Sequence, residues 1–357
     1  MALNPLTVKK LRRFRTIRRG YVSFLVLAGL IVLSLFGELL INSRALAVSY
    51  EGRLHFPTYG ANLPGTAFGL GYSYETNYRE LKKKFEAEGS KNWVLLPPFQ
   101  FNAFENTPYQ NVFKPAPPSC MGGPEGHLLG TDTTGRDIFA RLFFGFRVAI
   151  FFALAFMTLT YVIGISVGCM MGYFGGVFDL IVQRLIEVWS NIPFLYMVII
   201  IFSVIPSTLS IPARVAILLL VMVLFSWTSM TYYMRTATYR EKARDYTSAA
   251  IVIGAGTGRI IFNHILPNTI STVVTFMPFT IVSAITAVTA LDFLGFGLPA
   301  PTPSMGELLK QGTQTLTTAP WIVSSAFAAL VFILTLVTFI GEAVREAFDP
   351  KKFTTYE

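Results

Sequence analysis

The most regular feature of the sequence is a series of apolar runs, each about as long as a membrane is thick. The hydrocarbon core of a bilayer is about 30 Å thick, and an α-helix crosses it in about 20 residues. Runs of this length without a charge at their centres lie at 21–41, 148–172, 188–205, 215–234, 269–291 and 321–340. They predict an all-α membrane protein with six transmembrane helices.

The polar segments between these runs set the predicted domain organisation. Residues 42–146 mix both signs of charge and are rich in Pro, Tyr and Phe, which predicts an insertion outside the membrane between the first and second helices. Within it, Tyr78, Leu81 and Phe85 fall at helical spacing and predict a helix that packs one apolar stripe on the core of the insertion. A peptide-contacting aromatic surface is the alternative.

The predicted domains follow from these segments. They are a basic N-terminus with the first helix (1–41), the insertion (42–146), a transmembrane domain (147–345) that contains a polar loop at 235–268, and a tail (346–357).

Charge orients these helices in the membrane. The chain is 53% hydrophobic and 14% charged, with a net charge of +9, and its Lys and Arg residues flank the apolar runs rather than alternating with aromatics as in nucleic-acid-binding surfaces. We therefore expect membrane lipid and no nucleic acid as a partner. The chain has two basic clusters. One precedes the first apolar run: Lys9, Lys10, Arg12, Arg13, Arg15, Arg18 and Arg19. The other lies between the fourth and fifth runs: Arg235, Arg240, Lys242, Arg244 and Arg259.

Basic clusters beside short loops stay on the cytoplasmic side. Six helices then place both ends of the chain in the cytoplasm and the 42–146 insertion outside, since long loops cross regardless of charge. A cleavable signal ending near Ala45-Leu46-Ala47 is the alternative, but the first apolar run is longer than a signal core, which favours an anchor.

The sequence carries no motif for chemistry of its own. It lacks a G-x-x-x-x-G-K-[ST] loop, and the run Gly254–Arg259 does not have phosphate-loop spacing, so we expect no ATP hydrolysis and no cofactor. The centres of the apolar runs hold no acid or histidine of the kind that ion-coupled transporters use. His55, His127 and His264 are far apart and predict surface or loop positions rather than a metal site, and Cys120 and Cys169 predict no disulfide.

The polar loop at 235–268 has a pattern of its own. Residues 240–253 predict a short amphipathic helix with Tyr246, Ala249, Ala250 and Ile253 on one face, ended by the glycines at 254 and 256. A second helix from 258 to 266 should stop at Pro267, because proline breaks a helix interior. Small residues on the first helix would let it enter a groove of a partner; a plain connector is the alternative.

The spacing of this loop resembles the EAA loop of ABC-importer permeases: two alanines, a glycine four residues after the second, then His264-Ile265-Leu266-Pro267-Asn268. Other segments resemble the dipeptide and oligopeptide branch of these permeases. They are Leu129–Asp132, Gly135–Asp137, Arg141, Gly145, Arg147, Gly172–Gly176, Leu291–Gly297, Pro301–Gly306, Gly341, Glu342, Arg345, Asp349 and Pro350. The stretches YEGRLHFP and NWVLLPPFQF are similar to the Yej-type peptide permeases within this branch.

The resemblance implies a type I ABC importer permease fold in a bacterial inner membrane, moving peptides by alternating access. The implied partners are a second homologous permease subunit, two P-loop ATPase subunits and a periplasmic peptide-binding protein. The residues implied to contact the ATPases are Arg244, Asp245, Tyr246, Ser248, Ala249, Ala250, Gly254, His264, Leu266 and Pro267.

Two points depart from the family pattern or stay open. Ser248 replaces the glutamate that names the EAA loop, so that Glu241 or Asp245 would have to supply the charge. The Gly135-Arg136-Asp137 turn is either part of an external rim near the binding protein or a structural Arg–Asp pair. A membrane-anchored receptor that works through its external domain is the alternative to a transport subunit.

Overall fold

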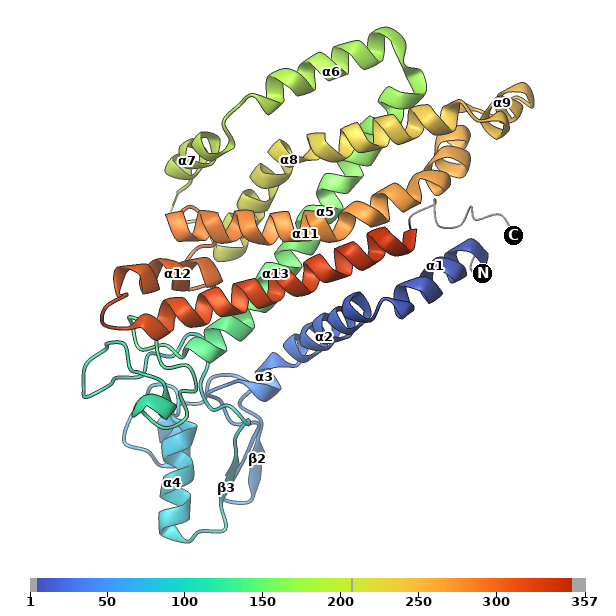
Figure 1. Cartoon of the computed structure of the whole chain (residues 1–357). Helices are drawn as coiled ribbons and strands as arrows, with labels where there is room; N and C mark the ends of the chain where they lie inside the picture. The colour runs from blue at the N-terminus through green and yellow to red at the C-terminus, as the bar shows by residue number, and fades with distance from the viewer. Residues whose placement is uncertain (1–4, 207, 349–357) are drawn as a thin grey trace. The chain divides into compact units, whose positions relative to one another are not determined.

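The computed structural model describes residues 5–206 and 208–348, most of which are helical (Figure 1). The chain forms two compact units, one from residues up to 27, 149–299 and 332 onward, the other from 28–148 and 300–331. In chain order the helices and strands are α1 Pro5–Thr16, α2 Arg18–Leu35, α3 Gly37–Leu40, β1 Ala47–Tyr50, β2 Arg53–His55, η1 Gly65–Phe68, α4 Tyr78–Glu88, β3 Trp93–Leu95, η2 Ser119–Met121, α5 Ile138–Phe174, α6 Gly176–Ser190, α7 Phe194–Val204, α8 Ile211–Lys242, α9 Asp245–Val252, α10 Thr257–Arg259, η3 Ile260–Ile265, α11 Leu266–Leu294, α12 Met305–Gln314 and α13 Pro320–Phe348.

The predicted membrane helices are present, with one difference. Within the described residues, five helical segments are long and apolar enough to cross a membrane: α2, α5, α8, the continuous run 257–294, and α13. The pair α6–α7 raises the number to six if it is counted as one broken span. The predicted tail lies outside the described residues from 349 on, as do Asp349 and Pro350 of the family pattern.

The third predicted span, 188–205, is not one straight helix. Helix α6 ends at Ser190, α7 begins at Phe194, and the two are bent by 71°. Pro193 lacks a backbone N–H and disfavours helical geometry in the residue before it, which explains the break. At about 1.5 Å per residue, α7 alone is too short to cross a bilayer.

The 28–148 and 300–331 unit has an α/β core. Strand β1 pairs antiparallel with both β2 and β3, with Val48 opposite His55 on one side and Val94 on the other. Helix α4 is capped at its start by Asn77, whose side chain accepts hydrogen bonds from the N–H groups of Arg79 and Glu80, and at its end by Gly89, which has a φ of +59°. Its buried Tyr78, Leu81 and Phe85 pack on Val48 and Phe68, which confirms the predicted apolar stripe.

This unit also includes residues 300–331, and no sequence pattern predicted that they would join the 42–146 segment. Ser304 begins α12 by accepting hydrogen bonds from the N–H groups of Gly306 and Glu307. Trp321, near the start of α13, donates from Nε1 to the carbonyl of Thr131 at 3.2 Å. The α12 helix is thereby held beside the segment that precedes α5.

The other unit is built on close packing of α5, α8 and α11 (Figure 1). Gly164, Gly168 and Gly172 of α5 face the backbone of α8: a Cβ atom on Gly168 would lie 2.5 Å from the Thr231 carbonyl oxygen. Glycine allows this approach, as in other membrane helix pairs. Met157 and Met234 lie in the apolar core between α5, α8 and α11.

Gly168→Ala should therefore destabilise the protein by about 1–3 kcal/mol, because the added methyl overpacks the contact with α8. Gly29→Ala in α2 is the matched control, since a Cβ there meets nothing within 4 Å. That change should be neutral or slightly stabilising through helix propensity. Thermal unfolding of the purified protein in detergent measures both, and equal melting temperatures for the two variants would contradict the close contact.

A candidate docking loop and a buried ion cluster

The 235–268 loop is a compact structure with its own apolar core. Ala250 of α9 and Ile260 and Ile265 of the π-helical turn η3 are buried together, and Tyr173 and Ala255 pack against them. Gly254 has a φ of +86°, which turns the chain, and the Ala255 N–H donates to the Ala250 carbonyl at 3.0 Å. The loop can therefore keep its shape when force acts on it.

Polar contacts fix α9 to the end of α8. The Tyr246 hydroxyl donates to the Glu241 carboxylate at 2.9 Å, and the Thr247 hydroxyl donates to the Glu241 carbonyl at 2.8 Å. Burial, and then the hydrogen bond to Glu241, raise the pKa of Tyr246 above its usual value. The Lys242 ammonium donates to the Tyr173 carbonyl at 2.5 Å, which ties the end of α8 to α5.

A second tie connects α6 with α8 just before the loop. The Asp179 carboxylate accepts from Nε and Nη2 of Arg235, both at 2.5 Å, and from the Tyr239 hydroxyl at 2.7 Å. Asp179 is buried. No sequence pattern predicted this contact, because its partners lie 56 and 60 residues apart.

The predicted loop residues divide into a buried and an exposed group. Of the predicted face, Tyr246, Ala249 and Ile253 are exposed, whereas Ala250 lies in the core of the loop. Ala250 is buried because Ile260 and Ile265 of the following turn pack on it. The exposed predicted residues are Arg244, Asp245, Tyr246, Ser248, Ala249, Gly254 and Pro267; His264 and Leu266 are half-buried.

Glu241 and Asp245 differ in the same way. The Glu241 carboxylate is buried and already bound to Tyr246, whereas Asp245 is exposed in the first turn of α9. Only Asp245 of these two acids has its charge on the surface of the loop.

Pro267 does not end a helix, which corrects the second prediction for this loop. The helical path is continuous from 257 to 294, and Pro267 occupies the first turn of α11, directly after η3. Proline has no N–H to donate and crowds the carbonyl four residues before it, so regular α geometry does not continue through this position. The preceding π-helical turn has the wider hydrogen-bond ring that such irregularities use.

Apolar side chains are exposed at the tip of the loop, which was not predicted as a contact surface. Val252 and Ile253 expose 87% and 85% of their surface, and Phe262 exposes 63%. Three exposed apolar side chains on one short loop are typical of an interaction surface. The run Ile251-Val252-Ile253 was the signal that pointed to them.

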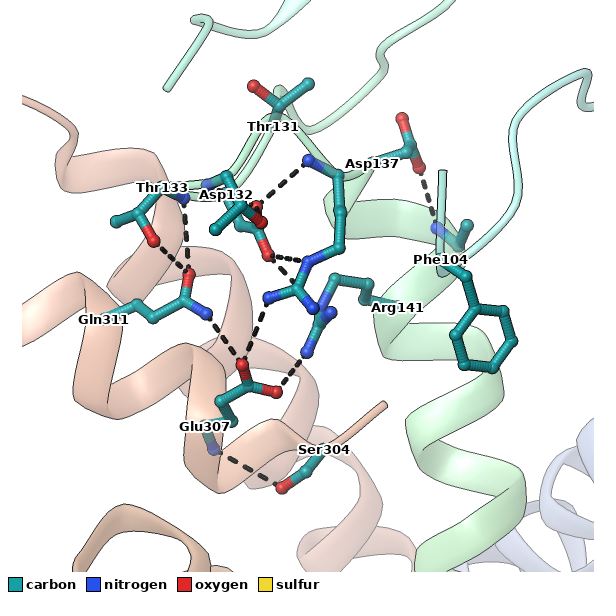
Figure 2. Close-up of polar contacts among 12 residues, drawn as sticks. Phe104, Thr131, Asp132, Thr133, Asp137, Arg141, Ser304, Glu307 and Gln311 are labelled. Atoms are coloured by element: carbon teal, nitrogen blue, oxygen red, sulfur yellow. Dashed lines mark hydrogen bonds and ion pairs between the residues drawn. The ribbon is translucent and has the colours of Figure 1, made fainter. Parts of the chain in front are cut away.

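A buried ion cluster lies in the 28–148 and 300–331 unit (Figure 2). Arg136 binds Asp132 at 2.9 Å and Glu307 at 3.1 Å; Arg141, which is fully buried, lies 3.5 Å from Asp132 and donates from Nη2 to Glu307. Gln311 donates to Glu307 and accepts from Thr133, both at 2.9 Å. Two arginines and two acids thus join the turn before α5 to α12.

The Gly135-Arg136-Asp137 turn points its side chains inward. Arg136 belongs to the ion cluster, and Asp137 accepts from the Ala140 N–H at the start of α5 at 2.8 Å. The other Asp137 oxygen lies 2.8 Å from Nδ1 of His127, which is in a loop, one of the two predicted positions, and is buried there. These contacts match the structural alternative for the turn.

Comparison with known proteins adds a family match. The family model described as "Binding-protein-dependent transport system inner membrane component" matches residues 164–354. The chain is 40% identical over 352 residues to the inner membrane ABC transporter permease protein YejE of Escherichia coli (strain K12), covering 98% of each chain. It is 35% identical over 372 residues to the peptidoglycan transport system permease protein YejE of Agrobacterium fabrum, covering 98% of this chain and 94% of that one.

More distant similarity covers less of the chain. The dipeptide transport system permease protein DppC of Haemophilus influenzae is 33% identical over 258 residues, covering 72% of this chain and 85% of that one. The family match contains the whole 235–268 loop, whereas Asp132, Arg136 and Arg141 precede it.

Glu307→Gln should destabilise the protein by about 3 kcal/mol, because it leaves the buried Arg141 guanidinium with only Asp132 as counter-charge. Glu125→Gln removes the same charge from an exposed position and serves as the control. Thermal unfolding in detergent reads out both. If the two variants melt together, the cluster does not stabilise this unit.

Proposed function

Because the chain belongs to the family of binding-protein-dependent transport system inner membrane components, we propose that it is the permease subunit of an ATP-driven peptide importer. Its relatives include permease proteins named for dipeptide and oligopeptide transport. Members of this family are transport subunits, not enzymes, and work with ATPase and substrate-binding partners. A membrane-anchored receptor, the alternative to a transport subunit, would need neither an ATPase nor a substrate-binding protein.

The observation that carries this proposal is the exposed apolar tip of a loop that is otherwise packed. Val252 and Ile253 are exposed at the end of α9, while Ala250 behind them is buried on Ile260 and Ile265. Such a tip fills a groove on a partner, and the internal core lets the loop move as one body. We assign the partner as the ATPase subunit, whose closure on ATP displaces the loop.

Hydrogen bonds and an ion pair between the loop and the membrane helices transmit this displacement of the loop to those helices. Lys242 binds the Tyr173 carbonyl at the end of α5, and Asp179 of α6 holds Arg235 of α8. A shift of α9 is thereby passed to three helices in the same unit. The opening and closing of a peptide path between this subunit and a second homologous permease follows from such a motion.

The proposed topology places the loop and both ends of the chain in the cytoplasm, and the 42–146 segment outside. The two basic clusters of the sequence support this orientation. The outer segment then faces a peptide-binding protein, and the Gly135-Arg136-Asp137 turn supports the rim from inside through its ion pairs.

The natural cysteines test the topology. Cys120 is exposed in the 42–146 segment and Cys169 is buried in α5, so a membrane-impermeant maleimide should label intact spheroplasts once, at Cys120. Cys120→Ser should abolish this labelling. Val252→Cys in the Cys120→Ser background should react only after the membrane is permeabilised; labelling in intact spheroplasts would reverse the orientation.

Val252→Asp with Ile253→Asp tests the docking tip. A charge buried without a partner opposes association strongly, so co-purification of the ATPase and peptide uptake should fall at least about tenfold, with the chain still in the membrane. Leu54→Asp, which adds one aspartate at an exposed apolar position of β2, should leave ATPase association unchanged. Normal ATPase recovery with the double variant would remove the docking assignment.

A further inference from the structure

A cavity of about 350 Å³ lies between α5, α8 and α11, separate from the loop. All of its walls belong to one compact unit. The side chains that line it are Phe156, Thr160, Tyr161, Phe225, Ser226, Ser229, Met230, Tyr233, Phe276, Phe279, Thr280 and Ser283.

The lining combines hydroxyl groups with aromatic rings. Seven of the lining side chains carry a hydroxyl, and none of the described residues that line the cavity carries a charge. The Tyr233 and Phe276 rings stack with centroids 3.9 Å apart, which forms a flat wall between α8 and α11. The Tyr161 and Thr280 hydroxyls hydrogen-bond at 2.8 Å across α5 and α11.

This many hydroxyls are unusual in helices that face hydrocarbon. Polar groups inside a membrane face the protein interior or a water-filled path, and they mark functional sites. A lipid chain offers these groups no partner, whereas a polar ligand or water does.

We propose that this cavity is where the subunit contacts the main chain of a peptide in transit, an assignment that rests on the proposed import function. A hydroxyl both donates and accepts, so it pairs equally with the N–H and the C=O groups of a peptide. The aromatic rings pack on apolar side chains, and the volume is at the lower end for ligand pockets, so only a short stretch of the peptide is held.

The lack of charge has a specific consequence for selectivity. A site that recognises N–H and C=O groups does not separate acidic from basic peptides, because neither meets an opposite or a like charge. Adding one fixed charge to the wall should create such a separation, since the attraction and the repulsion are both strong away from bulk water.

The test uses Ser283→Asp in the complete importer, purified with its natural partners and reconstituted in vesicles. The probes are a lysine-containing and a glutamate-containing tripeptide that are otherwise identical. Relative to wild type, the ratio of basic to acidic peptide uptake should rise about tenfold, and Ser283→Lys should lower it by a similar factor. Ser229→Asp on α8 should act as Ser283→Asp does and replaces it if that variant does not assemble.

Ser203→Asp is the matched control. Ser203 lies on α7, is exposed, and α7 contributes no residue to the cavity wall. The ratio of basic to acidic peptide uptake by this variant should equal that of the wild type. If the Asp and Lys variants at Ser283 and Ser229 change uptake of both peptides by the same factor, the cavity is not a peptide contact, although the importer function stands. If the wild-type complex imports neither peptide, the import function itself fails.

Discussion

The contact between α5 and α8 is the constraint on which the functional geometry depends. Three glycines of α5 lie against the α8 backbone, from Gly164 beside Met230 to Gly172 beside Thr238. One end of this contact is level with the hydroxyl-lined cavity and the other with the start of the 235–268 loop. Because the two backbones meet directly, α8 cannot slide along α5 without separating from it, and loop and cavity are connected through a single packed surface.

Apolar runs and one amphipathic stripe made much of the fold predictable. The membrane helices and the buried stripe of α4 follow from periodicity, which needs no knowledge of distant contacts. The break at Pro193 was also encoded locally but was hidden by the apolar character of the flanking residues. The association of residues 300–331 with the 28–148 segment was not predictable. It depends on ion pairs such as Arg136–Glu307, whose partners are 171 positions apart.

The loop shows where pattern recognition stops. The spacing of alanines and glycine identified the segment, but it did not show which side chains face inward. Ala250 is small because it must fit against Ile260 and Ile265, and the surface for a partner is formed by Val252 and Ile253 instead. Both roles are compatible with the same sequence pattern, and only the position at which α9 ends distinguishes them.

The π-helical turn at Ile260–Ile265 has a further consequence, for the rotational phase of α11. Each residue of an α-helix turns the chain by about 100°, so a π-helical turn that accommodates one additional residue rotates everything after it by that angle relative to a regular helix. Phe276, Thr280 and Ser283 lie on α11 beyond this turn and line the cavity. The junction between loop and membrane helix therefore sets the rotational phase between the 235–268 loop and the side of α11 that lines the cavity.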